Sequence, residues 1–349
     1  MNAPTAERER SARHALRDAG AALLWALGVT RPRVAARGAL TIVTFHRVLP
    51  VEQLAASPLP GLCVTPAFLD EALAFFARQF RCLTVSEAVR AHARGERQAR
   101  PLLAVTFDDG RADGFEHARP LLAKHGVPGT FYAVANAVDS PEPLWPDALA
   151  LEVQTLAARG SAGREAVAEV FAAPITPQTR DAQLPKLAAN LAKAWPAARI
   201  ALALAKLRAA SGGAPLPRWE RAMRWDELAA LTREGHEIGS HSLSHAILLR
   251  ECLPDLGAEV AGSKRVLEDK LGLPVTSFCY PSGLYDDAAL AAVAAAGYEN
   301  ATTTLPGMNR GVAAPFELRR VDIDGVLNAR HDGTASRSVL AWRLSRDAP

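Results

Sequence analysis

Apolar residues occur in short runs along most of the chain, and these runs alternate with segments of helical periodicity. Most runs contain β-branched or aromatic residues and are bounded by turn residues, which is typical of buried strands. They cover residues 39–45, 81–85, 102–107, 129–134, 236–240, 275–280, 298–304 and 317–323. About seven strands alternating with helices predict an α/β fold with a parallel sheet or a (β/α) barrel, complete or incomplete.

The helices between these runs carry start and stop signals. Thr65 and Pro66 predict the N-cap and first position of a helix that continues to about Phe80. Ser86 is predicted to cap the next helix, which runs to Arg94. Further helices are predicted over 115–125, 224–234, 256–271 and 286–296, and each is followed by a glycine that suits a helix C-terminus.

The alternation is interrupted between about residues 139 and 221, where the chain is rich in Ala, Leu, Lys and Arg and divided by prolines. This pattern predicts several helices with proline-marked joints. An insertion on the face that carries the loops after the strands would lie beside an active site. Trp145, Trp195 and Trp219 are candidates for packing the insertion's core, or one of them for covering that site.

Residues 1–38 and 331–349 flank the predicted barrel, which covers 39–330. The first segment is basic, and its apolar stretch 19–29 is too short to span a bilayer. A signal peptide is not favoured, because Asp18 precedes that stretch, arginines follow it, and no clear cleavage site is present. We favour a helix that packs on the barrel over its alternative, a helix in peripheral contact with a membrane surface, and we expect a cytoplasmic protein, near the inner membrane if its source is bacterial. The tail 331–349 is polar and charged.

The composition changes this picture little. The 349-residue chain is 49% hydrophobic and 22% charged, enough for one large α/β domain with attachments or for two domains. The formal net charge is +3, without a block of Lys and Arg interleaved with aromatics, so nucleic acid is not expected as a partner. The four cysteines show no paired metal-binding spacing and do not indicate disulfides; Cys82 and Cys279 are expected in the core.

Two adjacent carboxylates, Asp108 and Asp109, follow the apolar run 102–107. Successive strand residues point to opposite faces, so both can serve one site only where the strand ends and the chain turns, which Gly110 permits. The carboxyl end of a buried parallel strand is where α/β folds keep their chemistry: one carboxylate can bind a metal while its neighbour acts as a base. The alternative is a plain turn with a helix N-cap.

His241 and His245 are four residues apart and follow another predicted strand. On one helical turn their imidazoles would share a face and hold one metal ion, with Asp109 or Asp108 as the third ligand and an open position for water. The spacing is common and often structural, but in a barrel both strand ends meet on one face. Zinc is the default metal for this ligand set, and iron, cobalt, nickel or manganese would also fit.

Three motifs in this order carry a family resemblance: Thr106-Phe107-Asp108-Asp109-Gly110, His241-Ser242-Leu243-Ser244-His245 and Tyr280-Pro281-Ser282-Gly283. Together they resemble the polysaccharide deacetylase family (NodB homology, carbohydrate esterase family 4), over most of residues 40 to 323 apart from the insertion. The resemblance implies a distorted (β/α)7 barrel that removes N- or O-acetyl groups from sugars. It also implies Asp108 as catalytic base, Asp109, His241 and His245 as metal ligands, and the backbone N–H of Ser282 as an oxyanion donor.

The chain departs from the family pattern at three points. Cys279 stands where the third motif often has Arg, and Tyr280-Pro281-Ser282-Gly283 instead resembles the Tyr-Pro-Tyr-Gly type motif of exopolysaccharide deacetylases. This resemblance implies Tyr280, Pro281 and Gly283 as substrate-binding residues. Arg320, in Leu318-Arg319-Arg320-Val321, resembles the arginine that braces the catalytic Asp; its alternative is a surface residue. No C-terminal Leu-x-His motif is present, and His331 lies in the polar tail. His46, in Thr44-Phe45-His46-Arg47-Val48, resembles the general acid of a permuted subgroup; its alternative is a packing role.

Three functions remain open from the sequence. The first is metal-dependent deacetylation of a polysaccharide or lipid-linked sugar in cell-surface or exopolysaccharide biosynthesis. The second is hydrolysis of an amide in a non-sugar substrate by the same ligand set. The third is a catalytically silent barrel that binds a glycan or a partner protein. The paired carboxylates and the two histidines favour an enzyme over the silent barrel.

Overall fold

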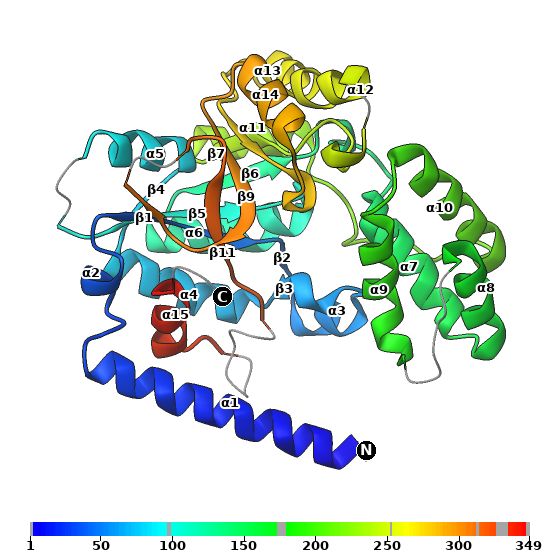
Figure 1. Ribbon diagram of the computed structural model, residues 1–349, viewed down its shortest axis with the longest axis horizontal. Helices are drawn as coiled ribbons and strands as arrows, with labels where there is room; N and C mark the ends of the chain where they lie inside the picture. The colour runs from blue at the N-terminus through cyan, green and yellow to red at the C-terminus, as the bar shows by residue number, and fades with distance from the viewer. Residues whose placement is uncertain are drawn as a thin grey trace.

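The computed structural model describes residues 3–95, 99–172, 179–251, 253–311, 314–325 and 334–346. Seven parallel strands close into a barrel at its centre (Figure 1). In order around the barrel they are β1 (Ala39–Phe45), β11 (Leu318–Asp322), β9 (Asn300–Pro306), β8 (Ser277–Cys279), β7 (Glu237–Ser240), β6 (Gly129–Ala133) and β5 (Leu102–Phe107). The barrel closes where Leu40 to Phe45 pair in parallel with Leu102 to Phe107. The predicted (β/α)7 fold is confirmed.

Four short strands accompany the barrel. β4 (Arg81–Leu83) pairs with the first half of β5, and β10 (Asn309–Arg310) pairs antiparallel with the start of β1. β2 (Arg47–Val48) and β3 (Cys63–Val64) form a separate two-stranded sheet. All seven residues of β1 and all six of β5 are buried, as expected for strands covered on both faces.

The helices that cover the barrel follow the strands in the expected alternation. They are α4 (Pro66–Gln79), α5 (Val85–Ala93), α6 (Arg119–His125), α11 (Trp225–Arg233), α13 (Ser263–Leu271) and α14 (Asp287–Ala295), with short helices α2 (Pro32–Ala35), α3 (Val51–Ala56) and α12 (Leu253–Gly257). The helix predicted over 256–271 is divided: a π-helical turn, Ala258–Gly262, joins α12 to α13. A second π-helical turn, Gly114–Ala118, precedes α6.

One predicted helix cap is correct and one is wrong. The Thr65 side chain accepts a hydrogen bond from the Phe68 N–H at 3.1 Å, with Pro66 at the first position of α4. For α5 the cap is Thr84 and not Ser86. Thr84 and Glu87 form a capping box, which satisfies two backbone donors reciprocally, and Ser86 instead hydrogen-bonds Glu237 of β7.

The insertion forms a helical body beside the barrel (Figure 1). Its helices are α7 (Trp145–Ala157), α8 (Ser161–Phe171), α9 (Leu184–Ala192) and α10 (Ala197–Ser211). It has an apolar core of its own, in which Trp195 stacks on Phe171 with ring centroids 5.1 Å apart. Trp195 is therefore a core anchor of the insertion.

The first and the last helix of the chain meet on one side of the barrel. α1 (Ala3–Ala26) contacts α15 (Arg337–Leu344), and Trp25 of α1 lies against Phe75 of α4 with ring centroids 6.0 Å apart. The segment 331–349, expected to be a polar tail, thus contains a helix with a buried apolar side. Its four buried residues are Val339, Leu340, Ala341 and Leu344. In the described part of the chain, no helix is both long enough and apolar enough to cross a bilayer.

Candidate active site

The carboxyl ends of the barrel strands surround a pocket of about 350 Å³. Most of the residues predicted for the site line it: His46, Asp108, Asp109, His241, His245, Ser282, Gly283 and Arg320. Tyr280 and Pro281, predicted as substrate-binding residues, are not among the described residues that line the pocket, because both are buried and Tyr280 stacks on Tyr285. His331 lies outside the described residues.

The turn after β5 separates the two carboxylates. Asp109 has a φ of 74°, which is unusual for a residue with a side chain, and Gly110 follows with a φ of 63°. A Cβ atom on Gly110 would lie 3.1 Å from the Cα of Ala133, so the position also requires the absence of a side chain. The turn lets consecutive residues face the same pocket, as the sequence predicted.

His241 and His245 reach the pocket from a loop, and the predicted helical turn is wrong. The loop follows β7, and Ser242 and His245 have φ values of 66° and 61°. The Ser242 hydroxyl accepts a hydrogen bond from the His245 N–H at 3.0 Å, and Glu259 accepts from the N–H groups of Leu243 and Ser244. These local bonds replace those of a helix and still bring both imidazoles to one point.

Asp109, His241 and His245 form a compact cluster. The Nε2 atoms of His241 and His245 both lie 3.4 Å from Asp109 Oδ1. Three ligands bonded to one tetrahedral zinc ion at about 2.0–2.1 Å would be roughly 3.3 Å apart. The Nδ1 atom of His241 lies 2.8 Å from the Cys279 carbonyl oxygen, which fixes the tautomer that leaves Nε2 free for a metal. The donor atoms and their spacing therefore fit a divalent cation.

Asp108 is held separately from this cluster. Arg320 donates two hydrogen bonds to its carboxylate, at 2.7 and 2.8 Å, and a third to the Thr303 carbonyl oxygen at 2.7 Å. Burial opposes ionisation of Asp108, but the Arg320 guanidinium holds the pKa of that carboxyl below its usual range. Arg320 is buried, so the surface alternative for this residue is wrong.

His46 follows β1 and lies beside Asp108. Its Nε2 atom is 3.9 Å from Asp108 Oδ2, and its side chain is 22% exposed, so a bound ligand could reach it. Another strand end, after β8, supplies Ser282 in a left-handed conformation with a φ of 57°. Such strain is typical of functional sites, where the surrounding structure maintains it.

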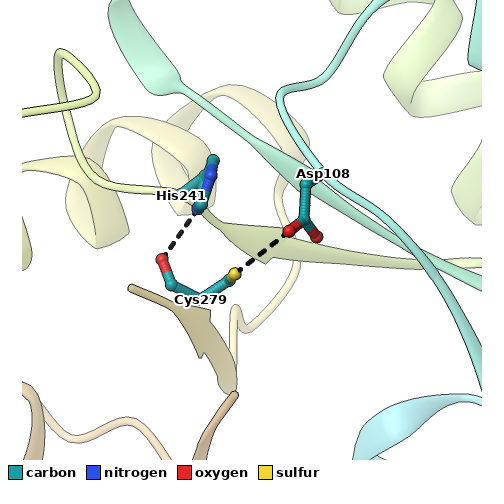
Figure 2. Close-up of side chains that lie close together, drawn as sticks. All are labelled: Asp108, His241 and Cys279. Carbon is teal, nitrogen blue, oxygen red and sulfur yellow. Dashed lines mark hydrogen bonds between the residues drawn. The ribbon is translucent and has the colours of Figure 1, made fainter. Parts of the chain in front are cut away.

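Two residues contribute to the site in ways that the sequence did not indicate. Cys279, predicted as a core residue, lies between Asp108 and His241 (Figure 2). Its Sγ atom is 3.6 Å from Asp108 Oδ2 while its carbonyl oxygen contacts His241. Trp145 of the insertion donates a hydrogen bond from Nε1 to the His245 carbonyl oxygen at 2.9 Å. The insertion therefore helps to hold the loop that carries a candidate metal ligand.

A model of the polysaccharide deacetylase family matches residues 95–176 and 187–301, more than half of the chain. No curated protein sequence matches the chain significantly.

Solved structures are similar in fold. The Streptococcus pyogenes deacetylase PplD in complex with acetate has 18% identity and a TM-score of 0.57 over 88% of this chain and 98% of that one. IcaB from Ammonifex degensii has 17% identity and a TM-score of 0.56 over 88% and 97%. The deacetylase domain of BpsB from Bordetella bronchiseptica has 14% identity and a TM-score of 0.51 over 82% and 96%.

Proposed function

Because the chain belongs to the polysaccharide deacetylase family, we propose that it removes N-acetyl or O-acetyl groups from a polysaccharide or lipid-linked sugar of cell-surface or exopolysaccharide biosynthesis. As a member of this family it is a carbohydrate deacetylase, a hydrolase. One observation supports this proposed reaction. Asp108 and Arg320 lie in the same pocket as the cluster formed by Asp109, His241 and His245.

The cluster is proposed to hold a divalent cation, most simply zinc. One carboxylate and two imidazole ligands leave an open position, where a bound cation would polarise the acetyl carbonyl group and a water molecule. Cobalt, nickel, manganese or iron would also accept these ligands.

The chain's own residues divide the remaining work. Asp108 takes a proton from the attacking water, and Arg320 keeps the Asp108 carboxylate ionised and oriented. The backbone N–H of Ser282 donates to the oxyanion that develops on the acetyl oxygen. His46 gives a proton to the leaving amine. Because this hydrogen bond comes from the main chain, the side chain at position 282 is free to vary.

The test is acetate release from a panel of N-acetylated glycans and lipid-linked sugars. We expect metal-loaded protein to release acetate, Asp108→Asn to lose release by at least 100-fold while keeping its metal, and Asp109→Asn to lose metal and release together. Asp269→Asn, at an exposed carboxylate, is the matched control and should keep both.

Two outcomes would overturn the proposal. Stoichiometric metal binding with turnover only of a cyclic amide or another non-sugar amide would make the chain an amidase. Metal binding without turnover of any acyl substrate would favour a barrel that binds a glycan or partner protein.

We further propose that the protein acts on the cytoplasmic side of the inner membrane, in contact with the lipid surface through α1. Leu16, Leu23 and Leu27 are 76%, 60% and 68% exposed, and their spacing puts them on one face of the helical N-terminal region. Exposed arginines follow at positions 31, 33 and 37. Cell fractionation that recovered the protein outside the cell would contradict this placement.

A further inference from the structure

Two cationic side chains reach the active-site pocket from outside the barrel. Lys193 follows the last residue of α9 in the insertion, and Arg343 lies on α15 near the C-terminus. Both line the same pocket as Asp109 and His241. Figure 1 shows that α9 and α15 belong to two separate additions to the barrel. Neither residue belongs to the motifs that the sequence indicated.

Neither cation has a counter-ion in the part of the chain that the structure describes. The Nε atom of Arg343 is buried without a hydrogen-bond partner among the described residues. Burial lowers the pKa of Lys193, whereas Asp109 raises it. A buried donor without a partner is unfavourable, so the Nε atom of Arg343, a residue that lines this cavity, needs an explanation.

The carboxylates of the pocket are committed elsewhere. Asp108 is paired with Arg320, and Asp109 lies between the two histidines. Asp322 lines the pocket too, but it is an exposed residue. In the described part of the chain, the side-chain contacts of Asp108 and Asp109 thus lie with other residues, and neither carboxylate forms an ion pair with Lys193 or Arg343.

The positive charge extends from the pocket along α9. Lys186 lies on α9 and precedes Lys193, the residue that caps this helix, by seven residues or about two helical turns, so both side chains point to the same side. The Lys186 Nζ atom lies 4.0 Å from where a Cβ atom of Gly61 would be, and the adjacent Leu62 lines the pocket. An anionic ligand approaching the pocket from this side would meet Lys186 first and Lys193 next.

We propose that the pocket takes an acylated sugar that carries an anionic group, phosphate or carboxylate, and that Lys193 and Arg343 bind this group. The inference rests on the proposed deacetylase function and narrows its substrate class. The guanidinium and ammonium groups provide charge-assisted hydrogen bonds that a neutral glycan would leave unmade.

The first experiment compares three N-acetylated disaccharides that differ in one substituent: a neutral methyl glycoside, the corresponding 1-phosphate, and a lactyl ether that carries a carboxylate. For the native protein we expect kcat/KM to be at least tenfold higher for one anionic probe than for the neutral one, mainly through KM. This preference should fall at least fivefold in Lys193→Met and in Arg343→Met. A preference for the 1-phosphate would indicate a phosphate-linked sugar as substrate, and a preference for the carboxylate would indicate an acidic polysaccharide.

Lys206→Met on α10 and Arg337→Met at the start of α15 are the matched controls, because both positions are exposed. They should keep the native preference. Equal kcat/KM for neutral and anionic probes in the native protein would overturn the proposal, and so would a preference that Lys193→Met and Arg343→Met both retain.

A second experiment does not depend on turnover. Inorganic phosphate is titrated into the metal-free protein, and binding is followed by calorimetry, with circular dichroism to verify that each variant is folded. We expect Lys193→Met or Arg343→Met to weaken phosphate binding at least fivefold, and Lys206→Met to leave it unchanged. If phosphate binds in this way but no acetylated probe is hydrolysed, the anion site stands and the deacetylase function fails. Phosphate binding that is absent, or equal in all variants, would overturn the site.

Discussion

His46 lies 3.9 Å from the Asp108 carboxylate and is 22% exposed, a position from which it can protonate a leaving group. If this is its role, the need for His46 depends on the basicity of what leaves. An amine must be protonated as the carbon–nitrogen bond breaks, whereas a nitrophenolate leaves without a proton. We therefore expect His46→Ala to lower deacetylation of an N-acetyl sugar by about 10²–10⁴-fold.

The same variant should lose less than tenfold toward 4-nitrophenyl acetate, and steady-state kinetics with both substrates would show the difference. His117→Ala, which changes a partly exposed histidine on the turn before α6, is the control and should match the native protein. Equal losses on the amide and the activated ester would mean that His46 only packs or positions, and the general-acid role would be wrong.

Site residues at the carboxyl ends of the strands could be predicted from the sequence, because the carboxyl ends of all parallel barrel strands lie at the same end of the barrel. Asp108, Asp109, His241, His245 and Arg320 all reach the pocket in this way. Lys193 was not predictable, since its approach to the pocket depends on how the insertion packs against the barrel. Cys279 was predicted in the core and is buried, but its contacts with Asp108 and His241 require the register of β8 against its neighbours.

At the scale of elements, the loop after β7 shows what spacing cannot decide. A four-residue interval between histidines is compatible with a helix, and also with a loop in which Ser242 and His245 adopt positive φ. Six described residues other than glycine have positive φ, and Asp109, Ser242, His245 and Ser282 belong to the site. Their conformations are imposed by the surrounding packing and not by local preference, so local sequence patterns do not reveal them.

A buried ionic cluster joins the insertion to the barrel. Arg47 donates to Glu220 at 2.7 and 2.8 Å and to Asp113 at 2.9 Å, and Arg111 forms ion pairs with Glu220 at 3.1 Å and with Asp147 of α7. Removing one charge from such a cluster leaves its partners uncompensated. We expect Glu220→Gln to lower the free energy of unfolding by about 3 kcal/mol in urea titrations, and to expose the insertion to limited proteolysis.

The control for this prediction is Glu234→Gln. Glu234 pairs with Arg119 at the surface, where the two side chains are 35% and 37% exposed, and should contribute less than about 1 kcal/mol. Similar unfolding midpoints for the two variants would show that the Glu220 cluster does not stabilise the junction.

Glu237, the first residue of β7, predicts how stability depends on pH. Burial raises the pKa of its carboxyl group, although the side chains of Ser86 and Thr130 donate hydrogen bonds to it. The folded protein therefore binds this proton more tightly than the unfolded chain, so stability falls as the pH rises above the unfolded pKa of about 4.5. We expect the Tm of Glu237→Gln, relative to that of the native protein, to be higher at pH 8 than at pH 4.

Thermal melts across this pH range would measure the difference. Glu165→Gln, at an exposed position of α8, should follow the native pH profile throughout. A Tm difference between Glu237→Gln and the native protein that stays constant with pH, or shrinks toward pH 8, would contradict the burial argument.

At the scale of the whole molecule, the barrel carries three additions: α1, the helical insertion and α15. The helical insertion contributes Trp145 and Lys193 to the site, and α15 contributes Arg343. The alternation of strands and helices predicted a parallel sheet or a barrel, and the family resemblance implied the seven-stranded barrel that the structure has. The docking of α1 on α15 was not predictable, because the apolar residues of α15 lie within a segment that is otherwise polar and carries no motif.

The exposed leucines at the end of α1 lead to the last prediction. Leu23 and Leu27 are exposed one turn apart, and Arg31, Arg33 and Arg37 follow them, a combination that suits the surface of an anionic bilayer. We expect the protein to sediment with phosphatidylglycerol vesicles and less with phosphatidylcholine vesicles, with binding that weakens as salt is added.

Because each leucine that enters the bilayer contributes about 1.5–3 kcal/mol, Leu23→Ser with Leu27→Ser should lower vesicle binding at least tenfold. Leu202→Ser, at an exposed leucine of the insertion, should not change it. Absence of vesicle binding in the native protein, or an equal loss in Leu202→Ser, would rule out α1 as the membrane contact.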